Sequence, residues 1–268
     1  MKTEIKNIND YISKIQEINF LQKPKKNLFY RGVSKKKYDL NPKIFRKSAF
    51  TEKEVLLDYK HFLPRTAPNY DFPKDILKIL TDMQHYGIPT RLLDWSMAPL
   101  TALYFACSKN TEIPTDAKNP NENDGKIYIL NPWKLWSRII PTSINSDIHN
   151  INVKARALLS HYKIDEVKKI IHKEFDFEIE ETMLQKPFPF VSSFSNERII
   201  AQKGCFTIHG TNNGKLNDEE ITVLTISRAN KEKIINELNL LGIDDYLLFP
   251  DFEGMTKSFN RKKSLFNL

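Results

Sequence analysis

Glycine is scarce in this chain of 268 residues, and its placement restricts the possible folds more than any other feature of the sequence. The eight glycines stand far apart, at positions 32, 87, 125, 204, 210, 214, 242 and 254. None of them forms the Gly-x-Gly-x-x-Gly or Gly-x-x-x-x-Gly-Lys-Ser/Thr loops that cradle phosphates in Rossmann, kinase and P-loop proteins. The sequence therefore excludes these classes, and an anionic ligand would have to be bound without a glycine-rich loop.

The rest of the composition is that of an ordinary globular domain. Hydrophobic residues make up 40% and charged residues 28% of the chain, which excludes disordered, collagen-like and coiled-coil proteins. The first 19 residues lack the apolar stretch of a signal peptide, and no segment reaches the roughly 20 apolar residues of a membrane span. We therefore expect a cytoplasmic protein without membrane association. Cys107 and Cys205 lie in apolar surroundings and are expected to be buried free thiols.

The chain is basic, and its basic residues are clustered. It has 41 Lys and Arg against 33 Asp and Glu, a formal net charge of +8. The clusters are Lys23, Lys25 and Lys26, then Lys35 to Lys37, then Arg261, Lys262 and Lys263. Two interpretations stay open: a solvated surface that keeps the protein soluble, or a face that binds a polyanion such as nucleic acid.

Hydrophobic periodicity and turn residues predict a mixture of helices and strands. Helices are expected over 5–18, from a capping box at 51–54 through 62, and over 75–84, 100–107, 164–175 and 229–240. Strands are expected over 28–32, 90–94, 126–130, 199–208 and 220–226, whereas 109–125 has the composition of a surface loop and 137–160 is ambiguous. Because helices and strands do not alternate strictly and no linker or repeat divides the chain, we predict a single α+β domain with mixed or antiparallel sheets.

The densest run of chemically active side chains lies at 84–96. It contains His85, Tyr86, Thr90, Arg91 and Asp94, followed by Trp95. Loops and strand ends that concentrate such groups often carry function, and a guanidinium at a strand end fits a phosphate or carboxylate. The structural alternative is a buried ion pair between Arg91 and Asp94 that holds the turn.

Two further segments place charged groups among apolar residues. Arg31 follows three apolar residues in the predicted strand 28–32, and burying it requires an internal acid or an anionic ligand. Gly32 would let a ligand approach the backbone. Glu197, Arg198 and Gln202 interrupt the apolar pattern in the predicted strand 199–208 and just before it. The charge of Glu197 is also explained as one that keeps an edge strand soluble.

Together these segments resemble the FRG domain, which is named for its Phe/Tyr-Arg-Gly element. The resemblance rests on residues 29–32 (FYRG), 85–96 (HYGIPTRLLDWS) and 99–106, with later landmarks at Arg198, Gln202, Gly204, Phe206, 248–251 and Gly254. It divides the chain into an N-terminal helical extension (1–27), an FRG domain (28–258) and a basic tail (259–268). It also implies a toxin or defence factor, as suspected for bacterial and phage members, with a possible neutralising protein partner.

The order of these elements is also distantly similar to that of ADP-ribosyltransferases, which bind NAD without a glycine-rich loop. The resemblance implies an ADP-ribosyltransferase-like core in which Arg31 holds the NAD phosphates, Thr90 supports the nicotinamide ribose strand, and Tyr86 or Trp95 stacks on nicotinamide. The implied cofactor site is completed by Tyr30, Gly32, His85 and Gln202. The catalytic glutamate of those enzymes has no match, because Arg198 stands at its place and Glu197 one residue before it.

Two functions from different classes follow. The first is an enzyme that cleaves NAD or transfers ADP-ribose to a macromolecular acceptor, in a cleft formed by Arg31, Thr90, Arg91 and the late strand. Asp94 or Glu197 would then stabilise the oxocarbenium-like ribose. The second is a binding module that recognises a nucleotide or nucleic acid through the same arginines and the lysine clusters. The sequence contains no cluster with metal-ligand spacing and no Gly-x-Ser-x-Gly elbow, so we predict no metal site and no serine hydrolase.

Overall fold

The protein folds around one six-stranded antiparallel sheet in the order β4-β5-β2-β1-β3-β6, which confirms the predicted α+β domain. This computed structural model describes residues 4–21, 27–46, 50–66, 76–108, 123–137, 146–192, 196–211, 216, 218–252, 254–256, 258 and 259. The strands are β1 (Phe29–Val33), β2 (Leu92–Ser96), β3 (Gly125–Leu130), β4 (Phe188–Phe190), β5 (Gly204–Ile208) and β6 (Ile221–Ile226).

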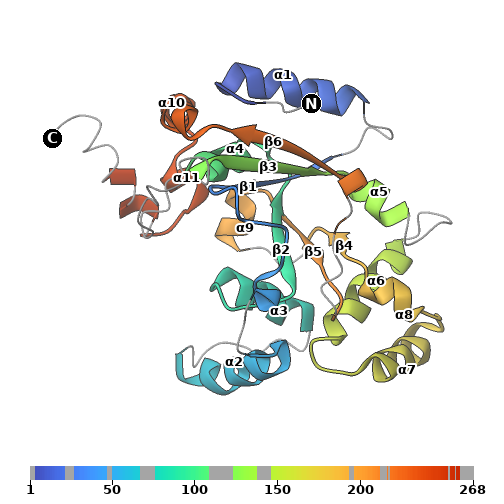
Figure 1. Ribbon diagram of the computed structural model, residues 1–268. Coiled ribbons are helices and arrows are strands. Elements are labelled where there is room, and N and C mark those ends of the chain that lie inside the picture. Colours follow the sequence, from blue (N-terminus) through green and yellow to red (C-terminus); the bar gives the residue numbers. More distant parts are fainter. Residues whose placement is uncertain are drawn as a thin grey trace.

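Helices surround the sheet (Figure 1). They are α1 (Ile8–Leu21), α2 (Glu52–Thr66), α3 (Ile76–His85), α4 (Pro99–Cys107), α5 (Pro132–Ser137), α6 (Ser146–Leu158), α7 (Ile164–Phe175), α8 (Glu181–Gln185), α9 (Glu197–Ala201), α10 (Arg228–Leu240) and α11 (Asp245–Leu248). The predicted capping box opens α2: the Thr51 N–H donates to Glu54 Oε2 at 2.7 Å, and the Glu54 N–H donates to Thr51 Oγ1 at 3.3 Å. Such reciprocal bonds satisfy amide groups that have no partner within the helix.

The sheet consists of two halves that are joined at one point. Strands β1 and β2 pair only through Tyr30 and Ser96, whereas β1 pairs with β3 along its whole length, as β2 does with β5. In Figure 1 the strands β1, β3 and β6 run across the molecule, and β2, β5 and β4 run down from them. The two central strands therefore splay apart beyond their single pair.

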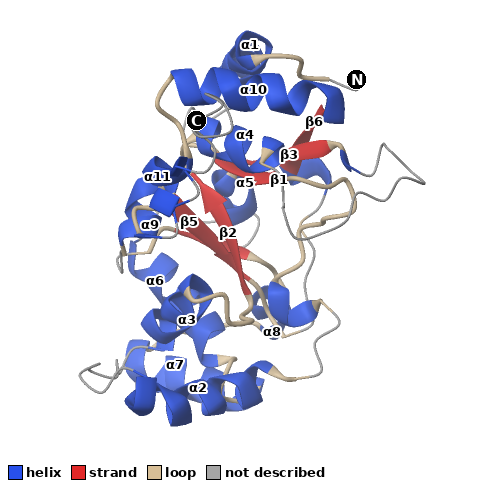
Figure 2. Cartoon of the chain, turned by 90° about the vertical axis from the view of Figure 1, so that its left-hand side faces the viewer, coloured by secondary structure: helices blue, strands red, loops and turns tan. Residues whose placement is uncertain are grey.

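The half formed by β1, β3 and β6 is covered on one face by α1, α4 and α10, which lie together at the top of Figure 2. Side chains alternate along these strands, and Tyr30, Ile127, Ile129, Leu224 and Ile226 point into a shared apolar core with the three helices. Helix α1 contributes Ile8, Tyr11, Ile15 and Ile18 to this core. The predicted N-terminal extension thus packs on the sheet rather than apart from it.

Gly32 permits the close approach of α4 to this half. A Cβ atom at position 32 would stand 1.8 Å from the carbonyl oxygen of Ala102 and 2.7 Å from the backbone nitrogen of Ala106. The backbone of α4 therefore occupies the space beside Gly32 in which a ligand was expected from the sequence. This packing explains the glycine without any bound molecule.

The half formed by β2, β5 and β4 packs against α3, α5, α6 and α9 around a second core. Helices α7 and α8 add a smaller cluster on the far side of α6. Arg156 of α6 is fully buried there, donates to the carbonyl oxygens of Lys186 and Met183, and lies over the Phe188 ring. Burial lowers the pKa of Arg156 to about 9. Its hydrogen bonds to Lys186 and Met183 tie α6 to the segment 183–186.

One predicted strand is partly wrong. Residues 199–208 do not form a single strand, because Glu197–Ala201 is helix α9 and β5 begins only at Gly204. Asn196 caps this helix, its side chain accepting from the Ile199 N–H at 2.9 Å, and Lys203 turns the chain with φ of 47°. Strands β5 and β6 also lie in different halves of the sheet, so they do not form a hairpin.

Several sequence expectations fall on residues that the structure does not describe. These are Lys23, Lys25 and Lys26, most of the predicted loop 109–125, residues 138–145 of the ambiguous segment, and Arg261 to Lys263 of the basic tail. In the remainder of the ambiguous segment, α6 begins at Ser146.

Candidate functional site

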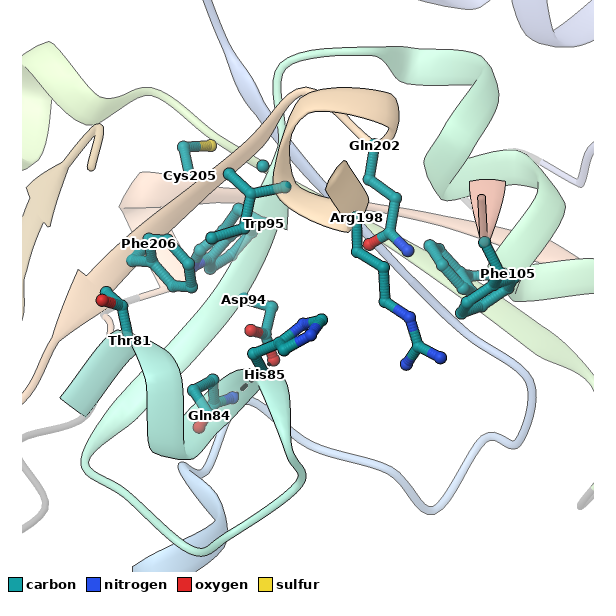
Figure 3. A pocket seen from close by; sticks show the side chains of 13 residues that line it. Thr81, Gln84, His85, Asp94, Trp95, Phe105, Arg198, Gln202, Cys205 and Phe206 are labelled. Atoms are coloured by element: carbon teal, nitrogen blue, oxygen red, sulfur yellow. Dashed lines mark hydrogen bonds between the residues drawn. The ribbon is translucent and has the colours of Figure 1, made fainter. Parts of the chain in front are cut away.

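A cavity of about 180 Å³ lies where the half containing β2 meets α3, α4, α9 and the segment after α11. The residues around it come from both halves of the chain: Thr81, Gln84, His85, Asp94, Trp95, Phe105, Arg198, Ile199, Gln202, Gly204, Cys205, Phe206 and Phe249. In Figure 3, His85, Asp94 and Arg198 point toward the same central space. The fold thus unites the segment 84–96 with the later segment that begins at residue 196.

Asp94 supplies the carboxylate of the cavity. It lies in β2, and its side chain is 50% exposed. The Nε2 group of Gln84 donates to its Oδ2 atom at 2.7 Å, which Figure 3 marks with a dashed line. Arg31 Nη1 lies 3.7 Å from the same oxygen. The carboxylate is therefore held from one side and open on the other.

Arg31 reaches from β1 to β2 across the point where the two strands splay. Its Nη1 group donates to the carbonyl oxygen of Asp94 at 2.6 Å, and its buried Nε atom makes no hydrogen bond among the described residues. Burial lowers the pKa of Arg31, while Asp94 acts in the opposite direction. The acid that the sequence required for Arg31 is thus Asp94, and Arg31 itself does not line the cavity.

His85 brings an imidazole into the cavity from the last turn of α3. Burial lowers its pKa, the nearby Arg198 lowers it further, and Asp82 and Asp251 partly oppose these effects. The ring is therefore neutral at pH 7 and can accept a proton. Tyr86 contacts the His85 ring edge-on but is 68% exposed and does not line the cavity.

Arg198 supplies the guanidinium of the cavity, whereas the sequence predicted Arg31 and Arg91 for this role. Its Nε and Nη2 atoms lie 2.8 and 2.5 Å from Asp251 Oδ2, and its guanidinium group lies over the Phe249 ring, 5.3 Å from the centroid. About 29% of its side chain remains exposed. Arg198 and Gln202 are four residues apart, so in a helix both lie on one face. This spacing is the sequence signal that could have predicted that both line the cavity.

Arg91 is buried in an ion pair and does not line the cavity. Its Nε group donates to Glu52 Oε2 and its backbone N–H donates to Glu52 Oε1 at 2.7 Å, and both side chains are 5% exposed. The ion pair between Arg91 and Asp94 considered from the sequence is therefore wrong, since Glu52 at the start of α2 takes that place. Thr90 is also buried and donates to Gln84 Oε1 at 2.6 Å.

The remaining predicted site residues divide between the cavity and other surroundings. Trp95 and Gln202 line the cavity; the Trp95 indole donates to Thr207 Oγ1 at 3.1 Å, and the Gln202 amide donates to the Leu248 carbonyl at 2.9 Å. Tyr30 lies on the opposite side of the sheet, in the core with α1. Glu197 is exposed in the first turn of α9 and does not line the cavity.

Two structural features are absent from the described part of the chain. Its residues include no group of three or more His, Cys, Asp or Glu side chains that could hold a metal ion. None of its helices has both the length and the apolar character needed to cross a membrane. Cys107 and Cys205 are buried free thiols, as predicted.

Comparison with known proteins finds similarity to one family model, over part of the chain. No curated protein and no solved structure matches the chain. The family model described as FRG domain matches residues 26–114, a segment that contains both β1 with its Phe29–Gly32 element and the motif at 85–96. This match supports the resemblance drawn from the sequence, since residues 26–114 are similar to the FRG domain.

Proposed function

We propose that the cavity binds a nucleotide and cleaves the bond between nicotinamide and ribose in NAD, passing ADP-ribose to a macromolecular acceptor or to water. One observation carries this proposal: the half-exposed Asp94 carboxylate faces a cavity that also holds a neutral imidazole and a guanidinium. A fixed carboxylate stabilises the oxocarbenium-like ribose that forms when a glycosidic bond breaks. The distant similarity to ADP-ribosyltransferases points to the same chemistry.

The side chains of the cavity have distinct roles in this proposal. Trp95, Phe105 and Phe206 provide apolar surface for the nicotinamide ring. Arg198 replaces Arg31 as the group that meets the phosphates. His85 accepts the proton of the attacking hydroxyl group or water molecule. Typical ligand pockets measure roughly 300–1,000 Å³, so a cavity of about 180 Å³ encloses the nicotinamide ribose end and leaves the adenosine outside.

The test compares two carboxylates that the sequence could not separate. Nicotinamide release and transfer of labelled ADP-ribose are measured for the full chain, for Asp94→Asn and for Glu197→Gln. We expect Asp94→Asn to lower the rate by about 100-fold or more, because the amide cannot stabilise the developing positive charge. Glu197→Gln should retain the rate, since Glu197 lies outside the cavity. Absence of nicotinamide release from the unmodified chain, or equal rates for the two variants, would overturn the proposal.

The biological setting that the family resemblance implies belongs to the same proposal. A chain that consumes NAD or modifies an essential acceptor would act as a toxin or defence factor in the cytoplasm, and would need a neutralising protein partner in its own host. Expression of the unmodified chain should then arrest growth, and expression of Asp94→Asn should not.

A second candidate function rests on a separate group of lysines where β1 ends and β3 begins, together with Lys231 of α10. Burial and then the neighbouring Lys36 lower the pKa of Lys126, and burial, followed by the smaller effect of Lys35, lowers the pKa of Lys231. Lysines that influence one another in this way are close in space, and such a cluster favours a polyanion. A gel shift with nucleic acid that weakens with salt and disappears when Lys35 to Lys37 become Gln would support this binding function.

A further inference from the structure

We infer that Gln84 and Thr90 form a hydrogen-bond relay that positions the Asp94 carboxylate and presents only its Oδ1 atom to the ligand. This inference rests on the proposed role of the cavity and assigns positioning roles to two residues that contact each other and not the reacting atoms. Thr90 donates to Gln84 Oε1 at 2.6 Å, and Gln84 Nε2 donates to Asp94 Oδ2 at 2.7 Å.

The direction of the relay follows from the chemistry of its ends. The backbone N–H of Leu92 donates to Thr90 Oγ1 at 3.1 Å, so the Thr90 hydroxyl accepts there and its own proton is free to point at Gln84. At the other end an ionised carboxylate can only accept. The Gln84 amide therefore has one consistent orientation, with its oxygen toward Thr90 and its nitrogen toward Asp94.

Arg31 completes the arrangement from the side of β1. Its Nη1 group donates to the Asp94 carbonyl oxygen and lies 3.7 Å from Oδ2, the oxygen that Gln84 already holds. Both contacts to the carboxylate thus fall on one oxygen. Among the described residues, Asp94 Oδ1 has no hydrogen-bond partner, and the side chain is half exposed toward the cavity.

The relay defines what kind of group can meet Asp94. An oxygen with free lone pairs and negative charge attracts a hydroxyl, an amino group or a developing cation, and repels a phosphate. The anionic part of a ligand is then directed to Arg198 on the opposite wall of the cavity. A ligand with a donor or electron-poor carbon at one end and an anionic group at the other matches both walls.

The spacing of the motif acquires a physical reason from this relay. Gln84 is in the last turn of α3, Thr90 stands just before β2, and Asp94 lies within β2. The turn between α3 and β2 brings the end of the helix close to the strand. Thr90 can then donate a hydrogen bond to Gln84, and Gln84 can donate one to Asp94. A purely structural role would explain the contact between Thr90 and Gln84 but not the donation to a half-exposed carboxylate.

The test follows the Gln84 side-chain amide by NMR, which needs neither NAD nor turnover. The chain has five glutamines, so selective ¹⁵N labelling gives few signals, and the Gln84 pair is assigned by its loss in Gln84→Ala. We expect its protons to exchange with solvent about tenfold faster in Asp94→Ala, because a hydrogen bond to a charged group is lost. Thr90→Val should accelerate exchange in the same way, whereas Thr90→Ser, which keeps the hydroxyl, should restore slow exchange.

The outcomes separate the relay from the proposed chemistry. Unchanged Gln84 exchange in Asp94→Ala, or equal exchange in Thr90→Val and Thr90→Ser, would overturn the relay even if the protein cleaves NAD. Slow exchange that depends on both partners supports the relay even if no NAD is consumed. Where NAD is cleaved, Gln84→Ala should lower kcat by about tenfold with little change in KM, because the carboxylate acts on the transition state.

Discussion

The two halves of the sheet are built from similar strands but differ in what their side chains face. In the half formed by β1, β3 and β6, one face is closed by three helices, and α4 lies so near that position 32 has no room for a side chain. In the half formed by β2, β5 and β4, the Asp94 carboxylate, the Arg198 guanidinium and the His85 imidazole meet around a cavity. The first half is therefore closed by helix packing, and the second, joined to it by a single residue pair, holds the candidate site.

The largest effect that distinguishes the halves is expected from Gly32→Ala. The new methyl group would overlap the Ala102 carbonyl, which belongs to a helix backbone and cannot rotate away. We expect a loss of about 4 kcal/mol or more of unfolding free energy, measured by urea denaturation. Gly87→Ala is the matched control, since Gly87 has φ of 73° but open space around it, and should cost only about 1 kcal/mol of backbone strain. Equal losses in the two variants would contradict the close packing of α4.

The next largest effect is expected from Glu52→Ala, which leaves Arg91 buried without its carboxylate. An unpaired buried charge of this kind destabilises a protein by about 3 kcal/mol, and both side chains are 5% exposed. Urea denaturation of Asp58→Asn provides the comparison, because Asp58 is exposed on the same helix and should change stability by less than about 0.5 kcal/mol. A similarly small loss for Glu52→Ala would mean that Arg91 does not depend on this pair.

A smaller effect is expected at the junction of the halves, in Arg31→Met. Methionine keeps much of the apolar stem and removes the guanidinium that donates to the Asp94 carbonyl. The loss of this charged hydrogen bond should lower the unfolding free energy by about 2 kcal/mol. Lys36→Gln, at an exposed position just after β1, should have almost no effect. If both variants unfold alike, Arg31 is not a link between the two halves.

The regular elements of both halves could be predicted because their signals are local. Apolar periodicity identified the helices that became α3, α4, α7 and α10, and short apolar runs identified β1, β3 and β6. The capping residues of α2 and the glycine after α10, which has φ of 76°, also follow from neighbouring residues alone. Local sequence patterns are therefore sufficient to predict most of the element order without knowledge of tertiary contacts.

The pairing of charges could not be predicted in this way. Arg91 is separated from Glu52 by 39 positions and Arg198 from Asp251 by 53, and no local pattern states which acid will fold against which base. The sequence consequently placed Arg91 in the cleft and left Arg198 out. The prediction that the strand 199–208 begins at Ile199 had a local cause, since Ile199 and Ile200 favour strands, and the capping signal of Asn196 was the stronger one.

The smallest effect concerns the dependence of stability on pH, which His85 links to the cavity. Burial and Arg198 hold its pKa below that of the unfolded chain, while Asp82 and Asp251 act against them. Below about pH 6.5 the unfolded chain then binds more protons than the folded one, so the unfolding free energy should fall as the pH decreases. Urea denaturation at pH 7 and pH 5 measures this loss, to which His149 and His161 also contribute because their pKa values are lowered too.

His85→Gln should reduce the difference in unfolding free energy between pH 7 and pH 5, and Arg198→Gln should reduce it less, since burial remains the larger cause of the lowered His85 pKa. An unchanged pH dependence in both variants would show that the surroundings of the cavity do not lower the pKa of His85. The half formed by β2, β5 and β4 would then have no imidazole with a lowered pKa at its cavity.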